Sequence, residues 1–227
     1  MDTQLEDAIR ARMDDNRVRT GPPPDGVPVP LIPVERYRDR AMWDLERDHV
    51  FRRTWLFAGH VSELAEPGAY RTFERSGAPI VIVRGNDNEI RAFYNSCRHR
   101  GAPVVREACG TARRLICQYH SWSYGTDGEL KSVPDARSFT GLDLGELGLV
   151  PVACAVRDGW VWVSEEPAVA SLDEYLGPVA DQMAEIDGPA MRFVGTQTHQ
   201  LACNWKLMVD AFLEVYHVRT VHPDNAA

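Results

Sequence analysis

The chain has 227 residues, of which 44% are hydrophobic and 26% charged, the balance of an ordinary soluble globular protein with room for a substantial core. Its formal net charge of −8 argues against a nucleic-acid partner, which would require a basic face. No apolar run approaches the length of a membrane span, and the charged N-terminus lacks the apolar core of a signal peptide. We therefore expect a cytoplasmic protein without membrane contact, whose five cysteines are metal ligands or buried thiols.

The first two thirds of the chain alternate between helical and extended patterns. Residues 1–20 predict a polar helix or a flexible arm, and the six prolines of the following GPPPDGVPVPLIP predict an extended connector. A helical pattern returns over residues 38–55. From residue 68 to 164 the sequence consists of short β-rich runs separated by turn residues, which predicts a compact antiparallel β domain.

The last third predicts helices again. Ser171 and Glu174 form a capping-box pattern at the start of a helical apolar period. A short strand is expected over residues 191–201, and a final helix is expected to continue to about His217. The overall fold class predicted from this order is α+β.

Two mixed pairs of cysteine and histidine lie at predicted strand ends. They are Cys97-x-His99 and Cys117-x-x-His120, with seventeen residues between them. Zinc fingers generally pair cysteine with cysteine and histidine with histidine, whereas each unit here supplies one of each. A Rieske-type [2Fe–2S] cluster has this composition, with two thiolates on one iron and two neutral imidazoles on the other. A structural zinc site and a coincidental core placement are the alternatives.

Residues around these pairs add information about a redox site. The Tyr124 hydroxyl can donate a hydrogen bond to a ligand sulfur, whereas Trp122 can shield the site or donate its indole N–H. Nearby arginines indicate either a solvated loop surface or a docking site for an acidic electron donor. They are Arg98, Arg100, Arg106, Arg113 and Arg114.

The other cysteines and two further histidines are not part of such Cys/His pairs. Cys109 is expected to be a thiol on a turn, while Cys154 and Cys203 lie in apolar, strand-like contexts and are expected to be buried. His49 and His60 are expected to pack or to lie at the surface, because neither has a ligand-like neighbour in the sequence.

A second group of polar residues lies near residue 227. Asp210, Glu214 and His217 have the spacing i, i+4, i+7, which places them on one face of a continuous helix. Pro223 disfavours helical geometry at His222 and can therefore turn its imidazole back toward His217. Two histidines and a carboxylate are the ligands of mononuclear non-haem Fe(II) oxygenases. The alternative is a polar helix face with two solvated histidines.

At both groups the sequence resembles the Rieske-type aromatic-ring-hydroxylating oxygenases, specifically their α (catalytic) subunits. The matching text is NSCRHRGAP at 95–103, CQYHSWSYGTDGEL at 117–130, and Asn-Trp-Lys from residue 204 followed by Glu-x-x-His-x4-His. The family usually has Pro and Gly where this chain has Gln118 and Ser121. The resemblance implies a cluster held by four residues and a mononuclear Fe(II) held by two histidines. The ligands so implied are Cys97, His99, Cys117 and His120 for the cluster, and His217 and His222 for the iron.

The resemblance also implies roles for the acidic residues of the second group. Glu214 stands where a carboxylate links a neighbouring subunit's Rieske histidine to the iron site; most ring-dihydroxylating relatives have Asp there, and some amine-oxygenating ones have Glu. Asp210 and Ala211 stand where the family usually has Glu-Asn. The family's third iron ligand comes from far downstream, beyond this sequence, and Asp224 in the step His222-Pro-Asp224 is a local substitute.

The implied organisation has three parts. Residues 1–39 would be an N-terminal helical arm and proline-rich linker, residues 40–165 an antiparallel β Rieske [2Fe–2S] domain, and residues 166–227 the incomplete beginning of an α+β catalytic domain.

The implied function is oxygenation. Electrons from NAD(P)H would arrive through a flavin reductase or ferredoxin, pass from the cluster to the mononuclear iron, and support O2-dependent mono- or dioxygenation of a small organic substrate, expected to be aromatic, as in the catabolism of aromatic compounds. The resemblance further implies a homo-oligomer, a trimer of α subunits with or without a β subunit. An electron-transfer module with a vestigial iron site and a zinc-binding interaction module are the competing hypotheses.

Overall fold

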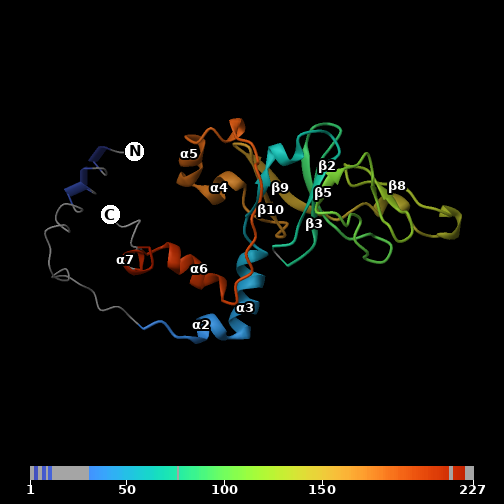
Figure 1. Ribbon diagram of the computed structural model, residues 1–227. Coiled ribbons are helices and arrows are strands. Elements are labelled where there is room, and N and C mark those ends of the chain that lie inside the picture. Colours follow the sequence, from blue (N-terminus) through green and yellow to red (C-terminus); the bar gives the residue numbers. More distant parts are fainter. Residues whose placement is uncertain are drawn as a thin grey trace. The chain divides into compact units, whose positions relative to one another are not determined.

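The computed structural model describes residues 3–4, 7–8, 10–11, 31–75, 77–214 and 217–222. The chain divides into two units, Met1–Arg38 and Asp39–Ala227 (Figure 1). In the first unit the described residues before residue 12 are helical, and the short helix α2 spans Glu35–Arg38. Most of the expected proline connector lies outside the described residues.

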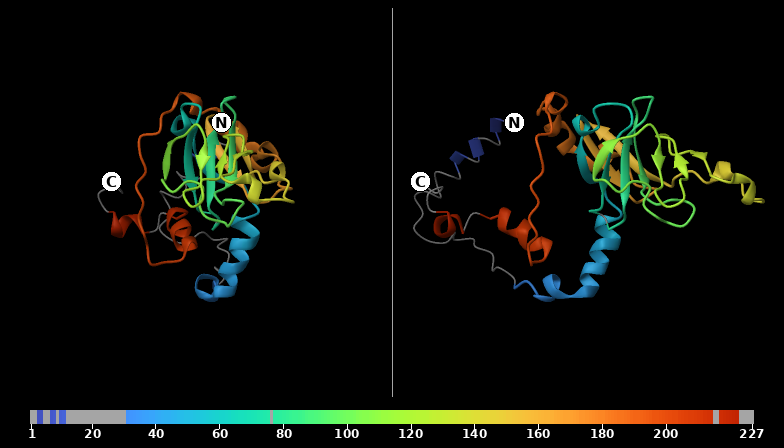
Figure 2. Two further views of the ribbon diagram at one scale, coloured as in Figure 1. Left: turned by 90° about the vertical axis from the view of Figure 1, so that its right-hand side faces the viewer. Right: turned by 45° about the vertical axis from the view of Figure 1, so that its right-hand side comes forward.

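The second unit is built on a seven-stranded sheet, in which every pair of neighbouring strands is antiparallel (Figure 2). The spatial order is β1-β10-β9-β4-β3-β2-β5. The strands are β1 (Leu56–His60), β2 (Ala69–Phe73), β3 (Ile80–Arg84), β4 (Ile90–Tyr94), β5 (Cys109–Thr111), β9 (Pro151–Arg157) and β10 (Trp160–Ser164). The antiparallel β domain is therefore confirmed. Its sheet starts at Leu56, earlier than the expected residue 68, because β1 pairs with the distant β10.

A small sheet lies beyond one end of the large one (Figure 1). Its three antiparallel strands are β6 (Leu115–Ile116), β7 (Ser123–Tyr124) and β8 (Leu130–Ser132). The loop between β6 and β7 carries the second Cys/His pair, and the first pair follows β4 of the large sheet. The two sheets thus bring the two pairs together from different parts of the chain.

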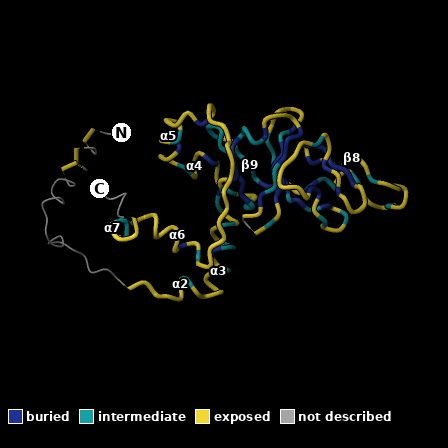
Figure 3. Tube along the Cα trace, in the orientation of Figure 1, coloured by how far each residue is buried: buried dark blue, intermediate teal, exposed yellow. Residues whose placement is uncertain are grey.

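Buried residues of the second unit gather along the strands, whereas α6 and the segment before it are largely exposed (Figure 3). The hydrophobic core has two halves, one on each face of β3. Val81 and Val83 pack on the side of the Cys/His loops, and Ile80 and Ile82 pack on the opposite side. All four side chains have 0% exposed surface. Each contributes about 1.5–3 kcal/mol by burial, so β3 is a rigid base for the loops that its neighbours carry.

Two helical segments precede the sheet. The α-helix α3 spans Arg40–Glu46, and the π-helix η1 spans Arg47–Phe51. They account for the helical pattern predicted over residues 38–55. The prediction lacked the change of helix type at residue 47.

The helical period after residue 171 forms two helices. Ser171 caps α4 (Leu172–Leu176) by accepting a hydrogen bond from the Glu174 N–H, and α5 spans Pro178–Ala184. Gly177, at φ 50°, separates them. A break occurs there because Pro178 has no N–H to continue the α4 ladder.

Two predictions for the C-terminal part are wrong. Residues 191–201 form no strand and are exposed, since this segment runs outside the sheets and a strand is stable only when its backbone groups are paired. The last helix also does not continue to His217: α6 spans Trp205–Phe212, and a separate short helix α7 spans Val218–Val221. Phe212 and Leu213 are 84% and 79% exposed, so little packing stabilises a further turn. Among the described residues, no helix has the length and apolar character to cross a membrane.

Candidate functional site

The first Cys/His loop is a tight turn that follows β4. The Cys97 N–H donates to the Ala102 carbonyl oxygen at 2.8 Å, and the Gly101 N–H donates to the Cys97 carbonyl oxygen at 2.8 Å. Gly101 has φ 75°, in the left-handed region that glycine adopts without strain. His99 lies at the tip of this turn, two residues after the cysteine.

The second loop repeats the same pattern of hydrogen bonds. The Cys117 N–H donates to the Trp122 carbonyl oxygen at 2.9 Å, and the Ser121 N–H donates to the Cys117 carbonyl oxygen at 2.9 Å. Ser121 occupies the position of the first loop's glycine and has φ 58°. A residue with a Cβ atom costs about 1–2 kcal/mol in this conformation. His120 lies just before this position.

Both thiols of these loops lie inside the core. Cys97 and Cys117 have 4% and 2% exposed surface. The Tyr124 hydroxyl oxygen accepts the Arg98 N–H at 3.0 Å and lies 3.2 Å from Cys97 Sγ, so its own proton is available to the sulfur. Burial raises the pKa of Tyr124, which keeps that proton in place. Burial also raises the pKa of Cys97, while the Tyr124 hydrogen bond acts in the opposite direction and stabilises the thiolate.

The two imidazoles lie together at the outer edge of the site. The ring centroids of His99 and His120 are 4.7 Å apart, at an interplanar angle of 71°. His99 stacks on the buried Trp122 ring at 5.1 Å, whereas His120 is exposed and contacts the Tyr119 ring at 4.0 Å. Burial lowers the pKa of His99, and the nearby charges of His120 and Arg100 lower it further. The His99 ring is therefore held in the neutral form that binds a metal.

The arrangement of these four side chains suits a two-iron cluster better than a single zinc ion. Among the described residues, no three His, Cys, Asp or Glu side chains converge on a point where one metal ion could sit. The four instead form a buried thiol pair and a more exposed imidazole pair. A tetrahedral zinc ion needs all four ligands around one centre. A two-iron cluster with thiolates at one end and imidazoles at the other suits two separate pairs.

The second group of residues is less compact than the sequence predicts. Asp210 lies in α6, whereas Glu214 and His217 follow the end of that helix, so the three do not share one continuous helical face. His222 has the non-helical φ −128°, and its ring centroid lies 5.8 Å from that of His217. The Asp224 alternative lies outside the described residues.

Glu214 and His217 form a close polar contact that bears on metal binding. His217 Nδ1 contacts Glu214 Oε1, and the His217 N–H donates to Glu214 Oε2 at 3.3 Å. A histidine whose Nδ1 is fixed by a carboxylate presents Nε2 to a metal, in a fixed orientation. His217 and His222 could therefore hold a metal, with Glu214 as the group that orients His217.

The structure corrects two predictions about the remaining cysteines. Cys109 is not on a turn, because it opens β5 and pairs with β2. Cys203 is exposed rather than buried, because it lies in the segment outside the sheets. Cys154 is half-buried in β9, and burial raises its pKa to about 12. His60 is buried and caps the 3-10 helix η2 (Val61–Leu64), while His49 is exposed.

Sequence reasoning missed two aromatic residues at the imidazole edge. The Phe139 ring lies 6.0 Å from that of His99 and 5.5 Å from that of Trp122. Tyr119, which covers His120, could have been found because it lies between two expected ligands. Phe139 carries no local signal, since the chain returns to the site only through its tertiary fold. A groove of about 440 Å³ passes Phe139 and the two imidazoles. It is lined by His99, His120, Ser121, Trp122, Pro134, Asp135, Ser138 and Phe139.

Two family models match the chain. A Rieske [2Fe–2S] domain matches residues 54–153, and the catalytic domain of the ring-hydroxylating alpha subunit matches residues 189–227. The first match includes both Cys/His loops, and the second includes Glu214 and both C-terminal histidines.

Curated proteins and solved structures agree with these matches. The chain is 33% identical to the glycine betaine monooxygenase oxygenase subunit of Chromohalobacter salexigens, over 85% of this chain and 43% of that protein. It is 34% identical to the chlorobenzene dioxygenase subunit alpha of a Cupriavidus species, over 81% of this chain and 42% of that protein. A solved quaternary ammonium Rieske monooxygenase matches with a TM-score of 0.81 and 28% identity, over 86% of this chain and 55% of that one. The chain thus spans about half the length of the relatives it matches.

Proposed function

Since this chain belongs to the family of Rieske oxygenase α subunits, we propose that it receives single electrons from a donor protein at a [2Fe–2S] cluster and delivers them to a mononuclear iron site for O2-dependent oxygenation of a small organic molecule. The observation that carries the proposal is the pair of matching loops, which carry two buried thiols and two adjacent imidazoles, of which that of His120 is exposed.

In this proposal the four loop residues hold the cluster. Cys97 and Cys117 would bind one iron, and His99 and His120 the other. When bound, such a cluster accepts and releases one electron at a time, and the mononuclear iron activates O2. The Tyr124 hydroxyl lies 3.2 Å from Cys97 Sγ and would donate its proton to that sulfur, which stabilises the added negative charge of the reduced state.

The exposed edge of the site offers a route for electrons to enter and leave. His120 is exposed, and the arginines around the loops are all exposed too, although the whole chain has a net charge of −8. A basic surface of this kind attracts an acidic ferredoxin or flavin reductase. It comprises Arg98, Arg100, Arg106, Arg113 and Arg114.

The second site would be formed by His217 and His222, with a third ligand that the described residues do not supply. Glu214 holds His217 through Nδ1. We propose that Glu214 also bridges a Rieske histidine of a neighbouring subunit to the iron site and so forms part of the path along which electrons reach the iron. This role requires an assembly of several α subunits, such as a trimer. Asp210, in the last helical turn before Glu214, would be an auxiliary acidic residue of this site.

The substrate class remains a proposal, because the similar proteins differ. One similar protein is named for glycine betaine, another for chlorobenzene. These similarities therefore do not favour the aromatic substrate expected from the sequence over a quaternary amine. Glu214, in place of the aspartate usual in ring-dihydroxylating relatives, favours the amine. Oxygen uptake with glycine betaine, carnitine and benzene as separate substrates decides between the classes in the intact enzyme.

Substitution of single ligands tests the cluster directly. Cys97→Ser and His120→Ala should each abolish the visible absorbance of the purified protein. Cys109→Ser is the matched control, since this exposed thiol in β5 lies outside the site and its loss should leave the absorbance unchanged. A colourless wild-type protein that contains zinc would contradict the proposal.

The second site has its own test. Glu214→Gln should retain the cluster absorbance and all bound iron but interrupt electron transfer to the mononuclear site in the intact enzyme. Unchanged substrate-coupled oxidation of the cluster would rule out the bridging role. Iron content distinguishes the oxygenase from the competing electron-transfer module: the oxygenase would hold three irons per chain and the module two.

A further inference from the structure

A buried carboxylate outside both candidate metal sites links helix α3 to helix α6 within the second unit. Glu46 is the last residue of α3, and its side chain is 11% exposed. Its Oε1 accepts a hydrogen bond from Lys206 Nζ at 2.5 Å, and its Oε2 accepts one from Trp205 Nε1 at 2.9 Å. The Lys206 side chain is 6% exposed, so this is an ion pair removed from water. Such a pair is held in one geometry because either charge alone would be costly to bury.

Both donors belong to the first turn of α6, the helix that leads to the second candidate site. Asn204 caps this helix by accepting the Lys206 N–H at 3.0 Å. Much of the rest of α6 is exposed, including Phe212 at 84%. The Trp205 ring also packs edge-to-face on Phe51 at 5.3 Å. The start of α6 is therefore fixed through Glu46 and Phe51, which stand one π-helical turn apart.

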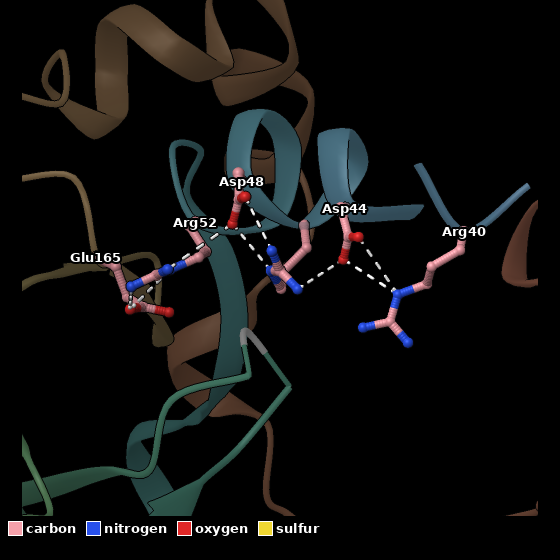
Figure 4. A network of polar contacts seen from close by, with 6 residues as sticks. Arg40, Asp44, Asp48, Arg52 and Glu165 are labelled. Carbon is pink, nitrogen blue, oxygen red and sulfur yellow. Dashed lines mark hydrogen bonds and ion pairs between the residues drawn. The ribbon is translucent and has the colours of Figure 1, made fainter. Parts of the chain in front are cut away.

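The other end of η1 is fastened to the Rieske sheet (Figure 4). Arg52 donates to Glu165 Oε2 at 3.2 Å, directly after β10, and the Tyr94 hydroxyl of β4 donates to the same oxygen at 3.2 Å. The Glu165 side chain is only 3% exposed. A ladder of alternating charges runs along α3 and η1 toward this contact. Its members are Arg40, Asp44, Arg47, Asp48 and Arg52.

Residues 46–52 thus form a short connecting segment, called the strut below. It contacts α6 through Glu46 and the seven-stranded sheet through Arg52. We propose that Glu46 is a positioning residue: through its pairing with Lys206 and Trp205 it sets the position of α6 relative to the Rieske domain, and with it that of Glu214, His217 and His222. The inference rests on the proposed function in so far as these residues form the second metal site.

Hydrogen exchange on the full chain tests this role. Glu46→Gln removes one buried charge and with it the buried ion pair with Lys206, so the α6 amides should exchange about a hundredfold faster. Asp44→Asn makes the same change of carboxylate to amide on an exposed ladder position of α3 and should leave α6 exchange as in the wild type. The double variant Glu46→Gln/Lys206→Met removes both charges and should restore α6 protection to within about tenfold.

Two spectroscopic readings separate positioning from general stability. Cluster absorbance should be the same in all variants, because the loops lie at the far end of the strut. Cobalt(II), used as a probe of the second site, should bind at least tenfold more weakly to Glu46→Gln than to Asp44→Asn.

Three results would overturn the inference: unchanged α6 exchange in Glu46→Gln, loss of the cluster in parallel with α6 protection, or a double variant as unprotected as the single one. Wild-type protein that binds no cobalt(II) at all would refute the second metal site of the proposed function. The hydrogen-exchange data would still test whether Glu46 positions α6.

Discussion

Replacing Tyr124 with Phe removes one oxygen atom from the interior of the site. That oxygen accepts the Arg98 N–H at 3.0 Å and lies 3.2 Å from Cys97 Sγ. Tyr124 has 0% exposed surface, so water does not readily take the place of the hydroxyl. The substitution therefore tests whether this hydrogen bond stabilises negative charge on the cluster sulfur, as the geometry indicates.

The size of the effect follows from the charge on the acceptor. A hydrogen bond to a charged group contributes about 1.5–3 kcal/mol. If about half of this is the additional interaction with the more negative reduced state, its loss favours the oxidised cluster by about 0.8–1.5 kcal/mol. Since 1.4 kcal/mol corresponds to about 59 mV for one electron, the reduction potential should fall by roughly 30–65 mV. The Arg98 N–H also loses its acceptor, so the free energy of unfolding should fall by about 1–3 kcal/mol.

An EPR-monitored redox titration of the purified protein measures the potential, and iron and sulfide analysis shows whether the cluster is complete. Tyr119→Phe is the matched control, because Tyr119 contacts His120 but its side chain is 60% exposed. Its potential should stay within about 10 mV of the wild type, a change well below the fall expected for Tyr124→Phe. A Tyr124→Phe protein with a full cluster and an unchanged or higher potential would refute the assigned role.

Three further predictions concern the loops and the other thiols. Ser121→Gly should stabilise the protein by about 1 kcal/mol in urea unfolding, since Ser121 has φ 58°, and a loss of stability would contradict the strain argument. Gly101→Ala should destabilise it by about 1–2 kcal/mol, through backbone strain alone, because an added Cβ would meet no atom closer than 3.8 Å. In a maleimide assay read by mass spectrometry at pH 7.5, Cys109 and Cys203 should react quickly. Cys154 should remain unmodified, because its raised pKa leaves almost no thiolate; rapid labelling of Cys154 would show that the strand is open.

The cluster loops were largely predictable from the sequence because the relevant signals are local. Cys97 and Cys117 each start a turn whose hydrogen bonds close within five residues, and Tyr124 follows the second turn directly. The pairing of β1 with β10 was not predictable in this way, since it joins segments about a hundred residues apart. The contact of Phe139 with His99 depends likewise on the tertiary fold.

The C-terminal part shows the opposite balance. The sequence spacing of Asp210, Glu214 and His217 predicts one helical face, but the helix ends at Phe212, because spacing alone does not provide the packing that a helix needs. The role of Glu46 was also not predictable from the sequence, because it lies in an ordinary helical pattern and its partner Lys206 is 160 residues away.

We propose that Cys97, His99, Cys117 and His120 together hold one mixed-ligand [2Fe–2S] cluster. Pulsed EPR of the dithionite-reduced protein tests this ligand set most directly, since nitrogen couplings identify histidine ligands of the reduced iron. The wild type should show couplings from two histidine nitrogens, and His120→Ala should lose the cluster signal. A reduced protein without an EPR signal, or with a signal that shows no nitrogen coupling, would contradict it.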